Sequence, residues 1–300
     1  MNKIKRILVP MNFSQSSLNA METAIAMCKR HNATLYLLNV LETEDMIPTA
    51  GMNVPVVELV LEMEISRSEN LKTLARKVRN NHNIPCYAQL ENGFTPYIIC
   101  SKAELLNCDL IVMGHNSRKS LKTYLSGSHI YKVMKHANCP VLTVPENASS
   151  LEFKNILFPV RPVAGILEKY QFIEPIINKN KASVLLFGTA NKSSSDFERV
   201  KKIVSRTEAQ LSMTETPVDH EYYWGKQIAE TIIERGKKTK ADLIVMTTTL
   251  SRSLKRFFIE EYAKKMISNP NIPVLSIKPR GYDGGKDYET KLILRTPVLS

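Results

Sequence analysis

The stretch Cys108-Asp109-Leu110-Ile111-Val112-Met113 returns later in the chain as Ala241-Asp242-Leu243-Ile244-Val245-Met246. At the same offset, Cys139-Pro140-Val141-Leu142-Thr143-Val144 returns as Ile272-Pro273-Val274-Leu275-Ser276-Ile277. Two segments that recur at the same offset in the sequence indicate that one unit is present twice. The repeat is about 140 residues long, which is the size of a domain and too long for a solenoid unit. The chain is therefore predicted to hold one domain in two copies.

Both copies alternate strand-like runs with helical patterns, and both open alike, with Ile7-Leu8-Val9-Pro10 matching Ile156-Leu157-Phe158-Pro159. Nearly continuous apolar runs such as 35–40 are typical of strands covered on both faces. Strands that alternate with helices form right-handed crossovers and a parallel sheet. We predict an α/β fold of two tandem doubly wound domains, each with a five-stranded parallel sheet. The expected strands are 4–9, 34–40, 85–90, 109–113 and 140–144, then near 155–160, 182–189, 215–221, 242–246 and 272–278.

The expected domains are residues 1–146 and 151–280, joined by the polar linker Asn147-Ala148-Ser149-Ser150. A tail, residues 281–300, has no counterpart in the first copy. Its segment Lys291-Leu292-Ile293-Leu294 is strand-like, so the tail either docks on the protein or frays as chain ends commonly do.

The composition, 43% hydrophobic and 23% charged, is that of an ordinary globular protein. No apolar run approaches the ~20 residues of a membrane span, and the N-terminus lacks the pattern of a secretory signal. A cytoplasmic protein with no membrane partner is expected. All five cysteines lie in the first copy, so we interpret them as reduced and mostly buried.

The net charge of +12 raises the question of nucleic acid. The basic excess is spread as short clusters such as Lys237-Lys238, and some clusters lie beside acidic residues at helical spacing. No recognisable nucleic-acid-binding motif accompanies them. The charge is interpreted as a solvated surface, and nucleic acid is not an expected partner.

The candidate site lies where the fourth strand of the first copy ends, in Met113-Gly114-His115-Asn116-Ser117. Nine residues later, Gly127 and Ser128 open a helix. Glycine lets the backbone approach a phosphate closely, and a helix N-terminus attracts anions. Ligands of doubly wound sheets bind at such strand ends. The pattern predicts a phosphate cradle, with Arg118, Lys119 and Lys122 as further sources of positive charge.

Over both repeats the chain resembles the universal stress protein family. The family signature G-x2-G-x9-G-[ST] is matched by Gly114-x2-Ser117-x9-Gly127-Ser128, with one glycine replaced. The first strand resembles the family's V-P-x-D-x-S, with Asn12 in place of the aspartate, and Val40 matches the valine whose backbone meets adenine. The resemblance implies an adenine nucleotide alpha hydrolase-like fold that binds ATP, with Mg²⁺. It implies these binding residues: Pro10, Asn12, Val40, Met113, Gly114, Ser117, Gly127, Ser128 and His129.

The resemblance also implies that strands 140–144 and 273–277 pair across a pseudo-twofold axis, which makes the chain an internal dimer. A homo-oligomer beyond this pair is an open expectation. Two departures bear on affinity: Asn12 keeps hydrogen-bonding capacity without charge, and Ser117 adds a Cβ.

The second copy has lost the cradle pattern. Thr247 replaces Gly114, Leu250 replaces Ser117, Glu260-Glu261 replaces Gly127-Ser128, and Arg161 replaces Asn12. We expect the two carboxylates at a helix N-terminus, where they would repel phosphate. Either Glu260 faces Arg256 or Arg161 as an internal anion, or the site has simply drifted. This half is not expected to bind ATP.

Three functions therefore remain open: a nucleotide-responsive stress factor, an interaction scaffold that binds no nucleotide, and a slow ATPase. The cradle loop holds no carboxylate to act as a general base, so efficient hydrolysis is disfavoured. The histidines show no metal-ligand spacing.

Several residues near the site have two interpretations. His115 and His129 either contact phosphate or are ordinary surface residues. Trp224 either stacks on a base or packs at a strand end. The segment 42–56 is either a lid over the nucleotide or an interface.

Overall fold

The computed structural model describes residues 3–42, 56–115, 129–148, 151–162, 166–190, 194–247, 256–268 and 271–278. The strands in these ranges are β1 (Arg6–Pro10), β2 (Thr34–Leu41), β3 (Cys86–Asn92), β4 (Leu110–His115), β5 (Val141–Pro145), β6 (Asn155–Val160), β7 (Ser183–Ala190), β8 (Val218–Trp224), β9 (Leu243–Thr247) and β10 (Val274–Ile277). The helices are α1 (Gln15–His31), α2 (Val56–His82), α3 (Thr95–Leu105), α5 (His129–His136), α6 (Ile166–Asn180), α7 (Ser194–Ser212), α8 (Ile228–Lys238) and α9 (Arg256–Ile267).

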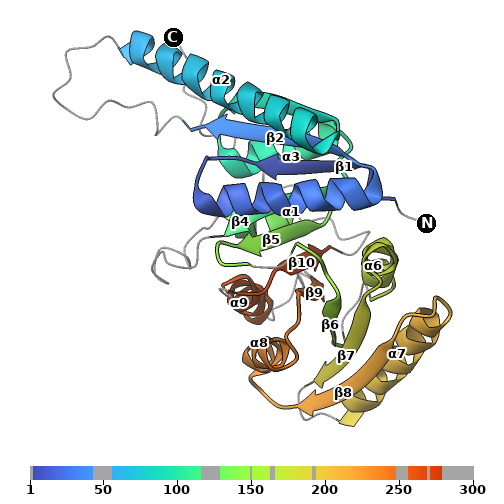
Figure 1. The fold of residues 1–300 in the computed structure, drawn as a ribbon. Helices are drawn as coiled ribbons and strands as arrows, with labels where there is room; N and C mark the ends of the chain where they lie inside the picture. Colours follow the sequence, from blue (N-terminus) through green and yellow to red (C-terminus); the bar gives the residue numbers. More distant parts are fainter. Residues whose placement is uncertain are drawn as a thin grey trace.

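All strands join one ten-stranded sheet in the order β3-β2-β1-β4-β5-β10-β9-β6-β7-β8 (Figure 1). Within each half the strands are parallel, and the order reverses beside the first strand of the half, as in a doubly wound fold. At the centre β5 and β10 pair antiparallel, with Leu142 opposite Leu275. The predicted fold class and the predicted pairing of the last strands are both confirmed.

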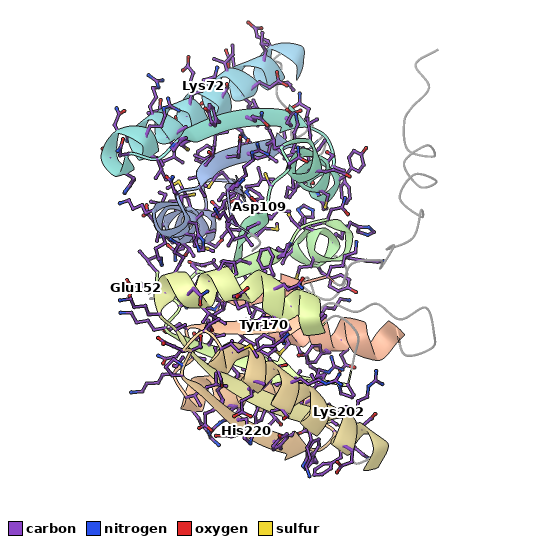
Figure 2. The ribbon with its side chains drawn as sticks, turned by 90° about the vertical axis from the view of Figure 1, so that its right-hand side faces the viewer. Lys72, Asp109, Glu152, Tyr170, Lys202 and His220 are labelled. Carbon is purple, nitrogen blue, oxygen red and sulfur yellow. The ribbon has the colours of Figure 1, made fainter. Side chains whose placement is uncertain are left out.

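Helices cover both faces of the sheet, in agreement with the continuous burial of central strands such as β5 and β9. Ile7 and Val9 of β1 contribute to the core under α1, α2, α6 and α7. Leu8, between them, contributes to the core under α3, α5, α8 and α9. Figure 2, turned by 90° from Figure 1, shows side chains filling the layers between helices and sheet. Each core runs through both halves of the molecule.

The repeated aspartate has the same structural role in both halves. Asp109 Oδ2 accepts the backbone N–H groups of Lys5 at 2.7 Å and Arg6 at 3.0 Å. Asp242 Oδ2 accepts those of Lys154 at 3.1 Å and Asn155 at 2.9 Å. The carboxylate thus satisfies two donors where the first strand of each half begins, which explains why the residue recurs in the repeat.

Further contacts hold the two halves together beside the central strand pair. Thr143 Oγ1 donates to the Val274 carbonyl at 3.2 Å. In the last turn of α1, Arg30 donates to Asn180 Oδ1 at 3.0 Å and to the Leu151 carbonyl. Burial lowers the pKa of Arg30.

The structure differs from the prediction at β8, expected at 215–221 and found at Val218–Trp224. Glu215 has a left-handed φ of 55° and Pro217 follows it, so the chain is still turning there. The five cysteines are free, and three of them are buried. The tail, residues 281–300, lies outside the described ranges. Among the helices described, none combines the length and apolar character needed to cross a bilayer.

Candidate functional site

Three adjacent strands of the first half end together and bring the expected binding residues to one edge of the sheet. Pro10 of β1 lies opposite Leu38 of β2, two residues before Val40. On the other side Leu8 lies opposite Ile111 of β4, so Met113 is abreast of Pro10. The strand ends are tied by Met11 N–H to Leu38 O at 2.7 Å, and by the buried Asn39, whose amide donates to the Met11 carbonyl at 2.5 Å.

Asn12 is exposed beyond the end of β1 and supports the turn into α1. Its Oδ1 accepts the backbone N–H of Ser14 at 3.2 Å and the Ser14 hydroxyl at 2.6 Å. Ser14 in turn caps α1 by accepting the N–H of Ser17 at 3.3 Å. The oxygen of Asn12 is therefore engaged within the turn, which leaves its amide nitrogen as the group able to donate to a ligand.

Gly114 has a packing role that the signature alone does not show. A Cβ on Gly114 would lie 2.2 Å from the Ser16 carbonyl oxygen and 2.6 Å from the Ser17 nitrogen, both backbone atoms of α1. The glycine therefore lets the first turn of α1 approach β4 closely. The same close approach brings the β1–α1 turn, with Asn12, to the end of β4.

His129 begins α5 and faces an unexpected carboxylate. Its Nε2 lies 3.7 Å from Glu42 Oε1, and its ring meets Phe94 edge-on at 6.0 Å between centroids. Glu42 follows the end of β2 and also accepts the backbone N–H of Thr95, at the start of α3, at 2.8 Å. An internal anion thus lies between the beginnings of two helices, where helix dipoles favour negative charge.

His115 fits neither interpretation from the sequence. It is 1% exposed, and its ring forms a hydrogen bond with the backbone of Ser268 in the other half of the molecule. Desolvation lowers the pKa of His115 to about 4, so the ring is neutral near pH 7. His115 is therefore a buried interdomain residue, and both expectations, a phosphate contact and an exposed loop residue, were wrong.

The remaining cradle residues, Ser117, Gly127 and Ser128, lie outside the described residues, as do Arg118, Lys119 and Lys122 of the same loop. Most of the segment 42–56, the lid candidate, lies outside them as well. The structure thus describes the part of the candidate site that is formed by the ends of β1, β2 and β4 with the start of α5.

The equivalent edge of the second half is filled by its own side chains. Arg161, after β6, stacks over the ring of Tyr262 of α9 at 4.1 Å and hydrogen-bonds to it. Lys169 of α6 is 1% exposed, donates to the Pro159 carbonyl at 2.5 Å, and lies 3.9 Å from the Phe158 ring centroid. Burial first, and then Arg161, hold the pKa of Lys169 well below its usual range.

The expected position of the two carboxylates of the second half was wrong. Helix α9 begins at Arg256, so Glu260 and Glu261 lie inside it rather than at its N-terminus. Glu261 forms a surface ion pair with Lys265 at 3.0 Å. The partner of Arg161 is an aromatic ring, and the side chain of Glu260 is outside the described set.

Sequence reasoning missed Glu42 and Lys169, because a single Glu after a strand and a single Lys in a helix carry no motif. Trp224 packs on Phe197 at 4.2 Å and stacks on Tyr222, which agrees with a packed strand end. Two hollows among the described residues lie elsewhere, one along β3 and α2 and one near Asn155 and Arg235. In the same ranges no three His, Cys, Asp or Glu side chains are placed to hold a metal ion.

Comparison with known proteins places this geometry in context. The model of the universal stress protein family matches residues 3–145 and 181–278. A universal stress protein of Methanocaldococcus jannaschii is 31% identical over 48% of this chain and 83% of its own length. Another, from Synechocystis, is 31% identical over 34% of this chain and 96% of its own. The crystal structure of a universal stress protein from Archaeoglobus fulgidus superposes with a TM-score of 0.70 at 16% identity, covering 95% of this chain and 98% of that one.

Proposed function

Because this chain belongs to the universal stress protein family, we propose that its first half binds ATP or a related adenine nucleotide and that the protein acts as a nucleotide-responsive stress factor. The observation that carries the proposal is the contrast between the two strand-end edges. In the first half the expected contacts, Pro10, Val40 and Met113, converge there. In the second half Arg161, Tyr262 and Lys169 fill the equivalent edge.

The described residues have the chemistry that a nucleotide requires. The backbone at Val40, on a half-buried strand end, would meet the base. The amide nitrogen of Asn12, which has no partner among the described residues, would donate to a ribose hydroxyl. The first N–H groups of α5, which begins at His129, would face the phosphates. Mg²⁺ would arrive with the nucleotide phosphates and offset their charge.

Glu42 narrows the class of ligand. Its carboxylate lies beside His129 and so beside the helix start that would receive phosphate. Like charges a few ångströms apart repel even near the surface. This repulsion favours a nucleotide whose phosphate charge is offset by Mg²⁺, or one with fewer phosphates, over free ATP.

The competing functions make different demands on this edge. A scaffold needs no ligand, and nothing at the edge would then respond to nucleotide. An ATPase needs a general base in reach of the γ-phosphate. Glu42 is a described carboxylate beside the start of α5, and its bond to Thr95 and its approach to His129 engage it as an acceptor. We therefore propose binding without efficient turnover.

Calorimetric titration of the full-length protein with Mg²⁺-ATP tests the proposal. Gly127→Glu copies the second half at the cradle and should abolish binding, because it sets a carboxylate where phosphate belongs. Gln227→Glu adds the same charge at the start of α8 in the second half and should leave affinity unchanged. Absence of heat with the wild-type protein, or equal affinity in wild type and Gly127→Glu, would overturn the assignment, and phosphate release would reveal an ATPase.

A smaller effect tests the role of Glu42. Glu42→Gln keeps an acceptor for Thr95 but removes the charge, so affinity for free ATP should rise by about threefold and affinity for adenosine should not change. An equal change for both ligands would show that Glu42 acts on the base or ribose instead of on the phosphates.

A further inference from the structure

The outer edge of β3 has no neighbouring strand among the described residues. In that part of the chain β3 ends the sheet and pairs with β2 alone, with Leu35 opposite Cys86. Leu35 N–H donates to Pro85 O at 2.9 Å. In a parallel ladder with this register, the backbone N–H and C=O groups of Tyr87 and Gln89 point toward β2. The backbone groups of Cys86, Ala88 and Leu90 point outward, away from β2. Arg79 of α2 donates to the Cys86 carbonyl, so the open part begins after it.

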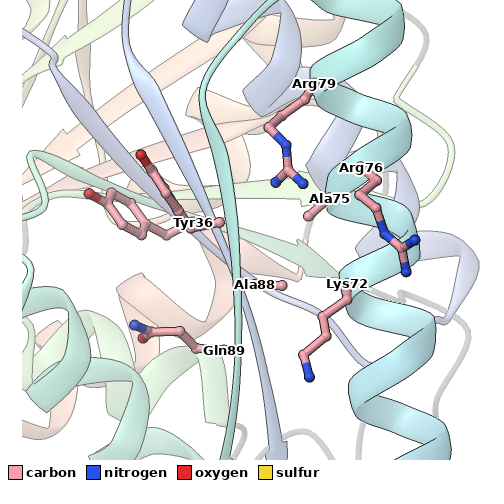
Figure 3. A pocket seen from close by; sticks show the side chains of 8 residues that line it. Tyr36, Lys72, Ala75, Arg76, Arg79, Ala88 and Gln89 are labelled. Atoms are coloured by element: carbon pink, nitrogen blue, oxygen red, sulfur yellow. The ribbon is translucent and has the colours of Figure 1, made fainter.

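A hollow of about 600 Å³ follows this edge. Figure 3 shows its lining on the two sides of the strand, with the basic side chains of α2 on one side and Tyr36 and Gln89 on the other. The lining residues are Tyr36, Lys72, Ala75, Arg76, Arg79, Tyr87, Ala88 and Gln89.

The two sides of the edge differ in chemistry. Lys72, Arg76 and Arg79 are spaced four and three residues apart, which places them on one face of α2 over about 10 Å. Within the described part of the chain, Lys72 and Arg76 make no ion pair with a carboxylate, and Arg76 reaches only the Thr73 hydroxyl at 3.4 Å. On the other side the rings of Tyr36 and Tyr87 stack at 5.5 Å, and Tyr87 is 55% exposed.

At the opposite edge of the sheet, β8, the flanking side chains make different contacts. Its His220 lies 3.1 Å from Glu208 of α7, and its Trp224 packs on Phe197. Lys201 of α7 lies over the Phe197 ring at 4.0 Å and 3.7 Å from Glu198. The side chains that flank β8 are thus engaged with one another, whereas those that flank β3 face the hollow.

We propose that the β3 edge binds an extended acidic segment of a partner protein, which adds a strand beside Ala88 and Leu90. Exposed strand edges are templates for such addition, in which backbone hydrogen bonds give affinity and alternate side chains give specificity. Side chains on one face of a strand are about 6.7 Å apart, so two carboxylates fit the row of cations on α2. The residues between them would lie on the tyrosine side, which favours aromatic or aliphatic side chains there.

Fluorescence anisotropy with the full-length protein tests this inference. The probe is a fluorescein-labelled, end-capped heptapeptide that alternates glutamate with tyrosine. Lys72→Glu with Arg76→Glu should weaken binding by about tenfold or more, since attraction becomes repulsion. Lys202→Glu with Arg206→Glu makes the same change at the same spacing on α7, at the opposite edge (Lys72 and Lys202 in Figure 2), and should leave binding within about twofold.

A second peptide separates strand addition from charge attraction. Methylation of its alternate backbone nitrogens keeps every side chain but removes the donors that a new strand needs, so binding should be lost. Equal binding of the methylated peptide, equal effects of the two double substitutions, or no binding of the parent peptide would overturn the proposal. A labelled oligothymidylate that binds through Lys72 and Arg76 while the peptide does not would assign the surface to nucleic acid instead. Circular dichroism of both variants checks that they are folded.

Discussion

The two halves of the molecule share a fold, but different residues occupy the equivalent turns and strand ends. Where helices turn back into strands, the first half has Asn32, Asn83 and Asn107, at left-handed φ angles of 54°, 54° and 49°. The second half has Lys181, Glu215 and Lys240 at 50°, 55° and 52°. Asparagine tolerates this conformation, whereas a long side chain is strained in it. The backbone geometry has thus been kept in the second half without the residues that suit it best.

The strand ends show the same asymmetry. Gly114 in the first half admits the backbone of α1, and Thr247 is the last residue of the equivalent strand in the second half. The first half keeps the edge where a nucleotide is proposed to bind, and the second half closes it with Arg161 on Tyr262. Because the sheet and both cores are continuous across the halves, the second half can serve as a structural partner without keeping a site of its own.

The largest expected effect comes from Gly114→Ala. The added Cβ meets backbone atoms of Ser16 and Ser17, which cannot rotate away, so we expect a loss of about 3 kcal/mol. Thr247→Ala at the matching position should cost about 1 kcal/mol or less. Urea unfolding of both variants measures the difference. If the two costs are equal, the close approach of α1 to β4 is not what requires the glycine.

Acid should weaken the first half through His115. Its pKa is lowered from 6.5 to about 4, so below pH 6.5 the unfolded chain takes up a proton that the folded chain refuses. Stability therefore falls as pH falls from 6.5 to 4, and by pH 5 this one group accounts for about 2 kcal/mol. His31 and His136, with pKa values also near 4, add to the dependence of stability on pH.

The measurement is chemical unfolding at pH 7 and pH 5 for wild type and His115→Gln. The glutamine can still hydrogen-bond the Ser268 backbone but does not titrate. The free energy of unfolding of the variant should therefore fall by about 2 kcal/mol less between pH 7 and pH 5 than that of the wild type. Parallel losses in the two proteins would mean that His115 is hydrated in solution.

How far the sequence predicted this structure depends on the range of the interactions. The repeat and its apolar runs predicted the strands, the sheet and the β5–β10 pairing, because these follow from periodicity. The start of β8 was predicted three residues too early, because the turn at Glu215 depends on a left-handed glutamate and such a residue carries no sequence signal. Asp109 was visible in the repeat, but its bonds to Lys5 and Arg6 join segments far apart in the chain. His115 was misjudged for the same reason, since its partner Ser268 belongs to the other half.

In the second half, Lys169→Met should raise stability by about 1 kcal/mol at pH 7. The substitution relieves the desolvation of an amine that has no carboxylate partner among the described residues, but it also leaves the Pro159 carbonyl without its donor. The lowered pKa means that the folded state gains stability as pH rises toward 10.5, the usual pKa of a lysine. The advantage of the variant should therefore shrink between pH 7 and pH 10. A constant advantage would indicate that packing, rather than ionisation, explains it.

The smallest expected effects lie at the left-handed positions, where they test the comparison most directly. Replacing Lys181 or Lys240 by asparagine gives the second half the residue type found at Asn32 and Asn107. Each change should stabilise by about 0.5 kcal/mol, because asparagine reaches a positive φ at lower energy than a long side chain does. Both lysines follow helix ends and make no ion pair within the described residues, so little else is lost. The reverse changes, Asn32→Lys and Asn107→Lys, should destabilise by a similar amount.

Thermal unfolding of the four variants gives two pairs of opposite sign if backbone strain is the cause. Shifts of one sign in all four would contradict backbone strain. Opposite shifts that disappear at high salt would show that local charge is the cause, since every forward change removes a positive charge and every reverse change adds one.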